Sequence, residues 1–224
     1  SPPQSLTGRV FFAGPPPPRH PLHLDHEPVT PGDSRPDLLS ERRIVNPQNH
    51  GIQNAVVFVK SGLAGPMPPP PAEPVVLKIQ GWRYEPHVAV VRVGQKLVVW
   101  NFDRSPCAPH TQSRYRAGET VERVTQPGQQ TTFQFFHTEA GFRLLDDIHA
   151  FLDATISVVD NPYHAVTDSD GTFAIPNLPP GNYTLTAWSD WYGELNQTIV
   201  WDSTKPLTLN FSFDANAPHV PLKP

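Results

Sequence analysis

Proline limits what this chain can fold into more than any other residue type does. The sequence holds 29 prolines among 224 residues, where an average protein has roughly 5%. Each proline fixes the backbone angle φ and has no amide hydrogen to donate, so long helices do not tolerate this density. Short strands joined by stiff, extended connections do. The sequence therefore predicts an all-β protein.

Strand-like segments recur along the chain at the spacing of β-sandwiches and barrels. They are short, rich in β-branched and aromatic residues, and bounded by turns of Gly, Pro, Asn and Asp. Residues 144–153 (LLDDIHAFLD) are the one stretch for which we expect a turn or two of helix. The eleven predicted strands are 8–13, 54–60, 75–80, 87–93, 96–102, 131–136, 154–160, 171–176, 182–188, 196–201 and 206–213.

Proline-rich stretches interrupt this pattern at 14–36, at 61–74 and in the tail 214–224. We expect the first two to be extended and polyproline-like, and to act as docking arms. A chain in this conformation loses little entropy when it lies across a partner. A flexible tether without a partner is the alternative. The arm side chains expected to touch a partner are Leu22, Leu24 and Met67.

Charge and hydropathy restrict the partners and the location. The net charge is −4 and no cluster of Lys or Arg occurs, so we expect no nucleic-acid binding. No apolar stretch approaches the roughly 18 residues of a membrane span. The chain begins at Ser1, and Met67 is its one methionine. This fits a periplasmic or extracellular bacterial protein whose signal peptide has been removed, although any trimmed chain would begin in the same way.

The segments IQGWRYEPHVAVVRVGQKLVVWNFDRSP and TTFQFFHTEAGFRLLDDIHAFLDATISV carry a first resemblance. An apolar strand, an aromatic turn, a Gly turn and a W-x-N-x-D strand follow one another. A Phe-rich strand then leads into a loop and a last strand. Residues 75–160 resemble the cupredoxins, and in particular the methylamine-utilisation-like members. The resemblance implies a Greek-key β-sandwich.

The segment AVTDSDGTFAIPNLPPGNYTLTAW carries a second resemblance. Its T-D-x-D-G-x-F and L-P-P-G-x-Y-T-L patterns make residues 161–213 resemble the carboxypeptidase-regulatory, transthyretin-like β-sandwich. That sandwich begins with G-x-V and A-x-V-x-V strands, which here stand far upstream as GRVFFA and NAVVFVK. We therefore expect a split sandwich with the cupredoxin-like module inserted. The alternative is an N-terminal extension followed by two consecutive modules.

The predicted fold is thus two β-sandwich modules with long Pro-rich segments. The N-terminal strands and the Pro-rich arm complete the regulatory-like sandwich, and a linker leads into the cupredoxin-like domain. The sandwich and a tail follow. The predicted boundaries are 1–60, 61–74, 75–160, 161–213 and 214–224.

The cupredoxin resemblance also implies where copper ligands would stand. Family members place a His after the N-x-D strand and a Cys, a His and a Met in one loop. Here these positions read Cys107, Asp146, His149 and Leu152, so only one His is retained. Leucine does not ligate, and a carboxylate cannot replace the copper–thiolate bond. We expect no blue-copper centre and no cofactor, with His149 a satisfied core histidine and Cys107 an apolar filler.

A rebuilt copper or zinc site is the alternative to a vacant one. It would use Cys107, His110, Asp146 and His149, a mixed set of sulfur, nitrogen and oxygen donors. No nucleophile elbow, phosphate loop or His-Glu-x-x-His motif occurs in the sequence, so we expect no enzyme.

Trp191 and Tyr192 stand at an apparent hairpin bend, where exposed aromatics could bind a partner protein. The sequence therefore favours a non-catalytic structural or interaction protein of the cell envelope. It would be an accessory subunit that stabilises a larger assembly, such as a respiratory or photosynthetic electron-transfer complex. The alternatives are a metal-binding protein or electron carrier, and a carbohydrate- or surface-binding module.

Overall fold

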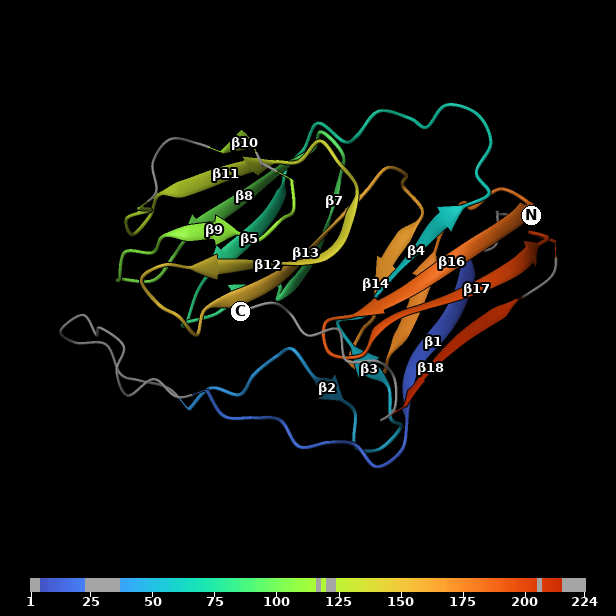
Figure 1. The fold of residues 1–224 in the computed structure, drawn as a ribbon, viewed down its shortest axis with the longest axis horizontal. Coiled ribbons are helices and arrows are strands. Elements are labelled where there is room, and N and C mark those ends of the chain that lie inside the picture. The colour runs from blue at the N-terminus through green and yellow to red at the C-terminus, as the bar shows by residue number, and fades with distance from the viewer. Residues whose placement is uncertain (1–4, 23–36, 116–117, 120–123, 205–206, 215–224) are drawn as a thin grey trace. The chain divides into compact units, whose positions relative to one another are not determined.

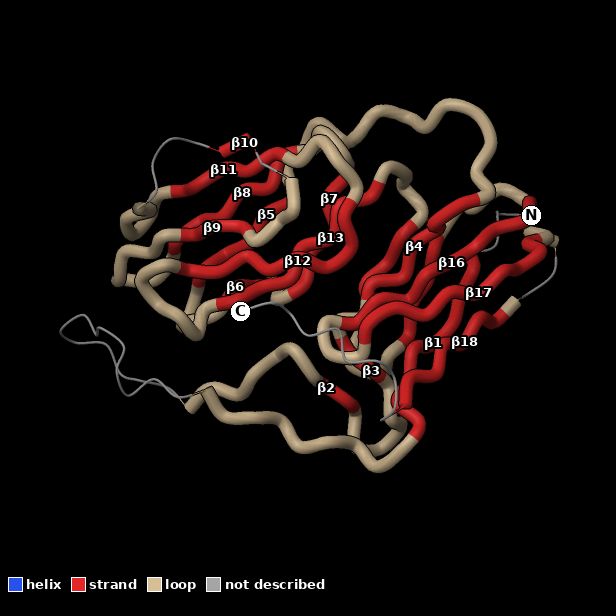
Figure 2. Tube along the Cα trace, in the orientation of Figure 1, coloured by secondary structure: helices blue, strands red, loops and turns tan. Residues whose placement is uncertain are grey.

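Figure 1 shows a computed structural model of the chain. The structure describes residues 5–22, 37–115, 118–119, 124–204 and 207–214. The described residues form strands and loops and contain no helix (Figure 2). These residues therefore include no helix that is long and apolar enough to cross a membrane. The all-β prediction is confirmed.

The helical turn expected within 144–153 is wrong. Strand β12 (Glu139–Asp146) runs into this segment, and β13 (Asp153–Val159) begins at its end. Side chains at Phe142, Leu144 and Asp146 are buried while those between them are partly exposed. This period of two is that of a strand with one buried face, and it outweighs the local helix propensity of the leucines.

The chain divides into two compact units. One consists of Ser1–Arg19, Glu41–Pro68 and Asn161–Pro224, and we call it the split unit. The other consists of His20–Ser40 and Pro69–Asp160, and we call it the inserted unit.

One sheet of the split unit joins the beginning and the end of the chain. Its strand order is β15-β1-β18, with bounds Thr172–Ile175, Leu6–Ala13 and Thr208–Asp214. β1 is antiparallel to β15 and parallel to β18. The early segment GRVFFA thus lies between two strands that come more than 150 residues later.

The second sheet of the split unit has the order β14-β4-β16-β17. Its bounds are His164–Val166, Val56–Ser61, Gly181–Ser189 and Gly193–Trp201. A short pair, β2 (Ile44–Val45) with β3 (Ile52–Gln53), stands apart. One apolar core unites the strands, and its largest fully buried members are Trp201, Phe211, Phe213, Leu6 and Ile52.

The inserted unit contains two sheets that share one core. The first has the order β10-β11-β8-β5-β6, and the second β7-β13-β12-β9. The bounds not yet given are β5 Val75–Ile79, β6 Tyr84–Glu85, β7 Val88–Arg92, β8 Lys96–Asn101, β9 Pro109–Thr111, β10 Gly118–Glu119 and β11 Gln130–Gln134. The core includes Leu77, Tyr84, Leu97, Phe133, Leu144 and Ile156.

The first proline-rich stretch divides between the units: residues 14–19 belong to the split unit with the N-terminal strands, and the inserted unit begins at His20. The amide of Leu22 donates to the carbonyl of Leu38 at 2.8 Å, and the amide of Ser40 donates to the carbonyl of His20 at 2.8 Å. Leu22 and Leu38 pack with Trp82 and Phe151 in a small apolar cluster. We call residues 20–22 and 37–40 the strap.

The second proline-rich stretch crosses between the units, and the boundary falls after Pro68, inside the predicted linker 61–74. Leu24 and the tail 215–224 lie outside the described residues.

Candidate functional site

The loop that follows β12 is the place where the cupredoxin resemblance puts metal ligands. Its organising residue is Asp146, which is 4% exposed. One carboxylate oxygen, Oδ2, accepts a hydrogen bond from the amide of Ala108 at 2.7 Å. The other, Oδ1, accepts from the amides of Ile148 at 3.0 Å and His149 at 2.8 Å. Asp146 thus closes its own loop and ties it to the segment before β9.

Burial dominates the electrostatics of this carboxyl. It raises the pKa of Asp146 above the ordinary value, while the hydrogen bonds from His149, Ala108 and Ile148 pull the pKa down. Both oxygens already serve as acceptors for backbone amides, which supports a structural role rather than a ligand role.

Cys107 is also buried, at 1% exposure. Its Sγ lies 3.6 Å from the carbonyl oxygen of Thr125. Burial, and next the negative charge of Asp146, raise the pKa of the Cys107 thiol to about 12. Because the thiolate is the form that binds metals, this environment opposes ligation by Cys107.

His149 is 3% exposed and surrounded by aromatic rings. Its Nε2 lies 3.2 Å from the carbonyl oxygen of Pro106. Its ring meets that of Trp82 edge-on, with the centroids 5.1 Å apart. Trp82 has a positive φ of 62°, and its amide donates to Oδ2 of Asp103 at 2.9 Å. His149 therefore packs as part of the wall between the loop and the strap cluster.

The four predicted ligand residues are all described, and they do not form one ligand set. No three of them bring their donor atoms within 4.8 Å of one another. His110 is part-exposed and its Nδ1 lies 3.0 Å from the carboxylate of the exposed Asp147. Leu152, at the axial position, is 2% exposed and belongs to the core. These donors do not fit a copper–thiolate centre.

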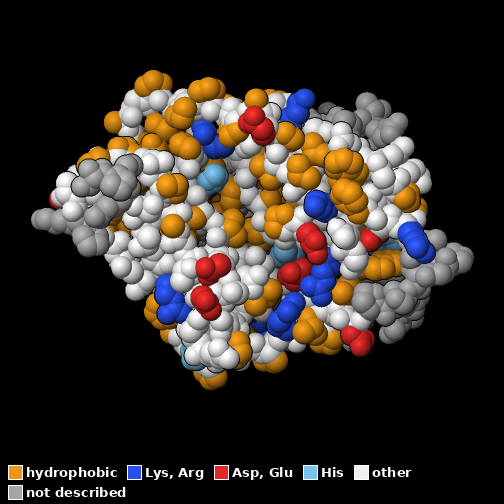
Figure 3. Space-filling view, turned by 180° about the vertical axis from the view of Figure 1, so that it is seen from behind, with side chains coloured by type: hydrophobic (Ala, Val, Ile, Leu, Met, Phe, Trp, Pro, Cys, Tyr) orange, Lys and Arg blue, Asp and Glu red, His pale blue; other side chains and the backbone are white. Residues whose placement is uncertain are grey.

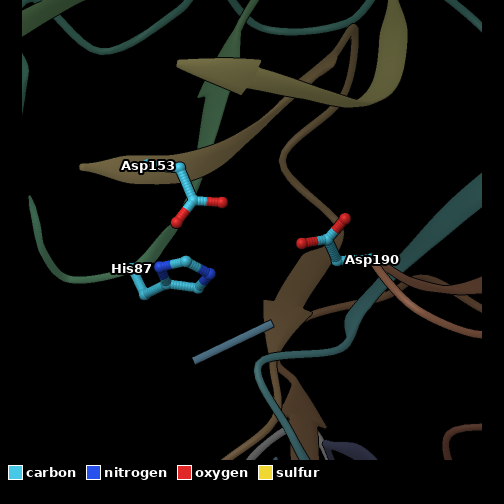
Figure 4. Close-up of side chains that lie close together, drawn as sticks. All are labelled: His87, Asp153 and Asp190. Carbon is cyan, nitrogen blue, oxygen red and sulfur yellow. The ribbon is translucent and has the colours of Figure 1, made fainter. Parts of the chain in front are cut away.

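Figure 4 shows two further side chains of the inserted unit, His87 before β7 and Asp153 at the start of β13. Sequence reasoning gave neither a role. Asp153 accepts a hydrogen bond from Nη2 of Arg143 at 2.7 Å. Asp190, also labelled there, belongs to the split unit and pairs with Nε of Arg42 at 2.9 Å. Each carboxylate is thus neutralised by an arginine of its own unit, which the sequence spacing does not reveal.

The two aromatics predicted to bind a partner behave differently. Tyr192 is 4% exposed, stacks on Phe12 with 5.0 Å between centroids, and lies 5.8 Å from Phe213. The expectation that Tyr192 is exposed is wrong, because the bend folds its ring into the core. Trp191 is partly exposed, and the guanidinium of Arg43 lies 4.6 Å from its ring centroid.

The arm residues also differ from one another. Leu22 is partly exposed and packs in the strap cluster of its own chain. Met67 is partly exposed between prolines.

The split unit has its own acidic turn and a cavity beside it. Asp168 accepts hydrogen bonds from the amides of Asp170 and Thr172, both at 2.9 Å, and from the Thr172 hydroxyl at 2.5 Å. These bonds, the Thr172 hydroxyl first, lower the pKa of Asp168. The open cavity measures about 590 Å³ and is lined by Thr7, Arg9, Val166, Asp168, Thr172 and Thr208 among others.

Charge offers no further site on the face drawn in Figure 3. Basic and acidic side chains lie interspersed there, and no large area carries one sign. A basic surface of the kind that binds nucleic acid is not present on this face.

Comparison with known proteins supports the two-part description. Residues 150–214 match the family model of the carboxypeptidase regulatory-like domain. No curated protein matches the chain significantly.

Among solved structures, the chain is similar to a copper-containing nitrite reductase from Thermus scotoductus SA-01. The identity is 16% and the TM-score 0.35, over 45% of this chain and 25% of the reductase chain. It is also similar to amicyanin from Paracoccus versutus, with 16% identity and a TM-score of 0.32 over 46% of this chain and 97% of the amicyanin chain. A third similar structure is a purple cupredoxin from Nitrosopumilus maritimus, with 14% identity and a TM-score of 0.33 over 38% of this chain and 99% of the cupredoxin chain. At this level the solved structures carry no argument about ligands or activity.

The prediction that the chain combines a cupredoxin-like module with a regulatory-like sandwich is confirmed at the level of fold. The family match covers the C-terminal strands of the split unit together with β13 of the inserted unit, and the inserted unit has two sheets around its own core.

Proposed function

We propose that this chain is a non-catalytic structural or interaction protein of the periplasm or the extracellular envelope. The inserted unit acts as a rigid scaffold whose ligand loop has become a structural loop. The chain then serves as an accessory subunit of a larger assembly, and an electron-transfer complex is the kind of assembly that suits a cupredoxin-like scaffold.

One observation carries the proposal. Where a copper site needs a thiolate, the chain has Asp146, and both its oxygens accept backbone amide hydrogens of the surrounding loop. A carboxylate used in this way organises the loop without a metal. The buried Leu152 at the axial position agrees with this use.

Metal analysis of the purified native protein, with a visible spectrum, tests the proposal. We expect no stoichiometric copper or zinc, and none of the intense visible absorption of a copper–thiolate centre. Stoichiometric metal that is lost in His149→Ala, while the fold is kept, would instead establish the alternative of a rebuilt metal site.

The interaction part of the proposal rests on the second proline-rich stretch. Met67 lies partly exposed among prolines of the crossing between the units. Limited proteolysis of envelope preparations and of the isolated chain tests this part. Cleavage near Met67 should be slow in the assembly and fast in the isolated chain. Equal rates in both would argue against docking.

A further inference from the structure

The edge strands of the four sandwich sheets differ greatly in length. In the inserted unit the described edges are β10, β6, β7 and β9, of two to five residues. In the split unit β14, β15 and β18 have three, four and seven residues, and β17 has nine. Short edges protect a sheet against further pairing, and β17 is the longest of the described edges.

β17 lacks the other devices that block an edge. Its sequence, GELNQTIVW, contains no proline and no basic residue. Its one charged side chain, Glu194, is already paired with Lys60. Pairing with β16 runs without a register shift, from Gly181 opposite Trp201 to Ser189 opposite Gly193. Among the described strands, β16 alone pairs with β17, so no described strand occupies the backbone groups on its other side. The side chain of Gln197 donates from Nε2 to the carbonyl of Asn210 in β18 at 2.7 Å.

Side chains of β17 leave apolar surface for a neighbour to cover. Leu195 and Ile199 pack against the core, yet both remain partly exposed. Val200, on the opposite face of the strand, is 77% exposed. An added strand would bury the flanks of these side chains, which favours association.

We propose that β17 pairs with β17 of a second copy of this chain, antiparallel, about a two-fold axis at Gln197. In this register Leu195 stands opposite Ile199 of the second copy on the core side. Asn196 stands opposite Thr198 of the second copy on the outer side. Each pair occurs twice, as a two-fold interface requires. In these two central pairs apolar meets apolar and polar meets polar.

The neighbouring registers are worse. Moving the axis to Asn196 places Leu195 opposite the polar Gln197, and moving it to Thr198 places Ile199 opposite Gln197. With the axis at Gln197, Glu194 faces Val200 and no like charges meet. Gln197 is the central residue of β17, so this register alone pairs all nine residues of the strand with the second copy, which favours a second copy over an unrelated strand.

Two double variants test this register. Asn196→Lys with Thr198→Lys places like charges opposite each other twice across the axis. Asn196→Glu with Thr198→Lys places opposite charges there. Both variants remove the Asn196 amide, which accepts from the Thr186 hydroxyl and from Lys60 and donates to Glu194. A carboxylate at position 196 can still accept from Thr186 and Lys60 and an ammonium group cannot, so the unfolding free energy of each variant is measured alongside its mass. Circular dichroism checks that both fold.

Sedimentation of the full chain over a range of concentrations gives the readout. We expect the wild-type chain and the Glu/Lys variant to reach twice the monomer mass of 24.9 kDa. We expect the Lys/Lys variant to remain monomeric. A wild-type chain that stays monomeric overturns the proposal, even if its edge binds a strand of another protein. Two variants that behave alike overturn it as well. The dimer goes beyond the proposed function, because the metal analysis does not depend on it.

Discussion

Each of the two units builds a tight turn around one aspartate, but one of these aspartates is exposed and the other is buried. Asp168 in the split unit is exposed, and its hydrogen bonds lower its pKa. Asp146 in the inserted unit is buried, and desolvation raises its pKa although three amides donate to it. The same capping chemistry therefore responds to pH in opposite directions. The comparison teaches that the balance between desolvation and hydrogen bonding decides the sign: hydrogen bonds prevail at the exposed Asp168 and desolvation prevails at the buried Asp146.

The largest expected effect is on Asp146. Asp146→Ala leaves three backbone amides, of Ala108, Ile148 and His149, without their acceptor. We expect the inserted unit to lose about 3 kcal/mol of unfolding free energy. Urea unfolding followed by tryptophan fluorescence measures the loss. Asp147→Ala, at the exposed neighbour, is the control and should change stability by less than about 0.5 kcal/mol. Equal losses of unfolding free energy in the two variants would contradict the claim that Asp146 organises the loop.

A smaller effect is expected at the turn of the split unit. Asp168→Ala removes the acceptor for Asp170 and Thr172 at an exposed site, where water can replace it. We expect a loss of about 1 kcal/mol. Hydrogen exchange read by mass spectrometry should show faster exchange in peptides around 168–172, with peptides of the inserted unit unchanged. Faster exchange throughout both units would contradict the independence of the two turns.

The pH dependence of the two units should diverge. The folded chain lowers the pKa of Asp168 below its ordinary value of 3.8, so its carboxylate stabilises the split unit at every pH above 3.8. This stabilisation is lost as the pH falls from 3.8 through the lowered pKa. The folded chain raises the pKa of Asp146 above its ordinary value, so the inserted unit loses stability as the pH rises from that value through the raised pKa. Lowering the pH protonates Asp146 and restores this stability.

Hydrogen exchange at neutral pH and near pH 3 compares the units directly, after correction for intrinsic exchange rates. Protection should fall in the split unit more than in the inserted unit. Asp168→Asn should flatten the response of the split unit. Loss of protection in the inserted unit first would show that the sign of one shift is wrong.

The smallest effect is expected at the strap. Leu38→Ser weakens the contact with Trp82, but the strap cluster lies apart from the main core, so detachment is local. We expect global stability to change by less than about 1 kcal/mol and Trp82 to become more accessible to a fluorescence quencher. Leu39→Ser, at the more exposed neighbour, is the control. Unchanged quenching in Leu38→Ser would mean that the strap does not cover Trp82.

Much of the fold follows from local pattern. The alternation in GRVFFA and the turn residues around Asp168 suffice to predict strands and a regulatory-like sandwich. The burial of Tyr192 does not follow, because a hairpin bend in the sequence does not tell which of two adjacent aromatics turns inward. The strand at 139–146 competes with a helix-like run of leucines, and tertiary pairing with β13 and β9 decides.

The sequence describes the candidate site only through the positions where it differs from the copper ligands of cupredoxins. Asp146 and Leu152 at ligand positions argue against copper, but the sequence does not show what Asp146 does instead. Its three amide donors come from both sides of a gap of nearly 40 residues and meet only in the folded chain. The sequence also does not show that Arg143 pairs with Asp153 across the β12–β13 strand pair, or that Arg42 pairs with Asp190 from 148 residues away.

Thermal unfolding of the inserted unit with a chelator, and again with excess copper or zinc, tests most directly whether its loop works without metal. A ligand that binds only the folded state raises the unfolding midpoint with its concentration. If Asp146 organises the loop by itself, the midpoint is the same in all three conditions and falls sharply in Asp146→Ala. A midpoint that rises with copper or zinc in the wild-type chain, and no longer rises in His149→Ala, would contradict the account.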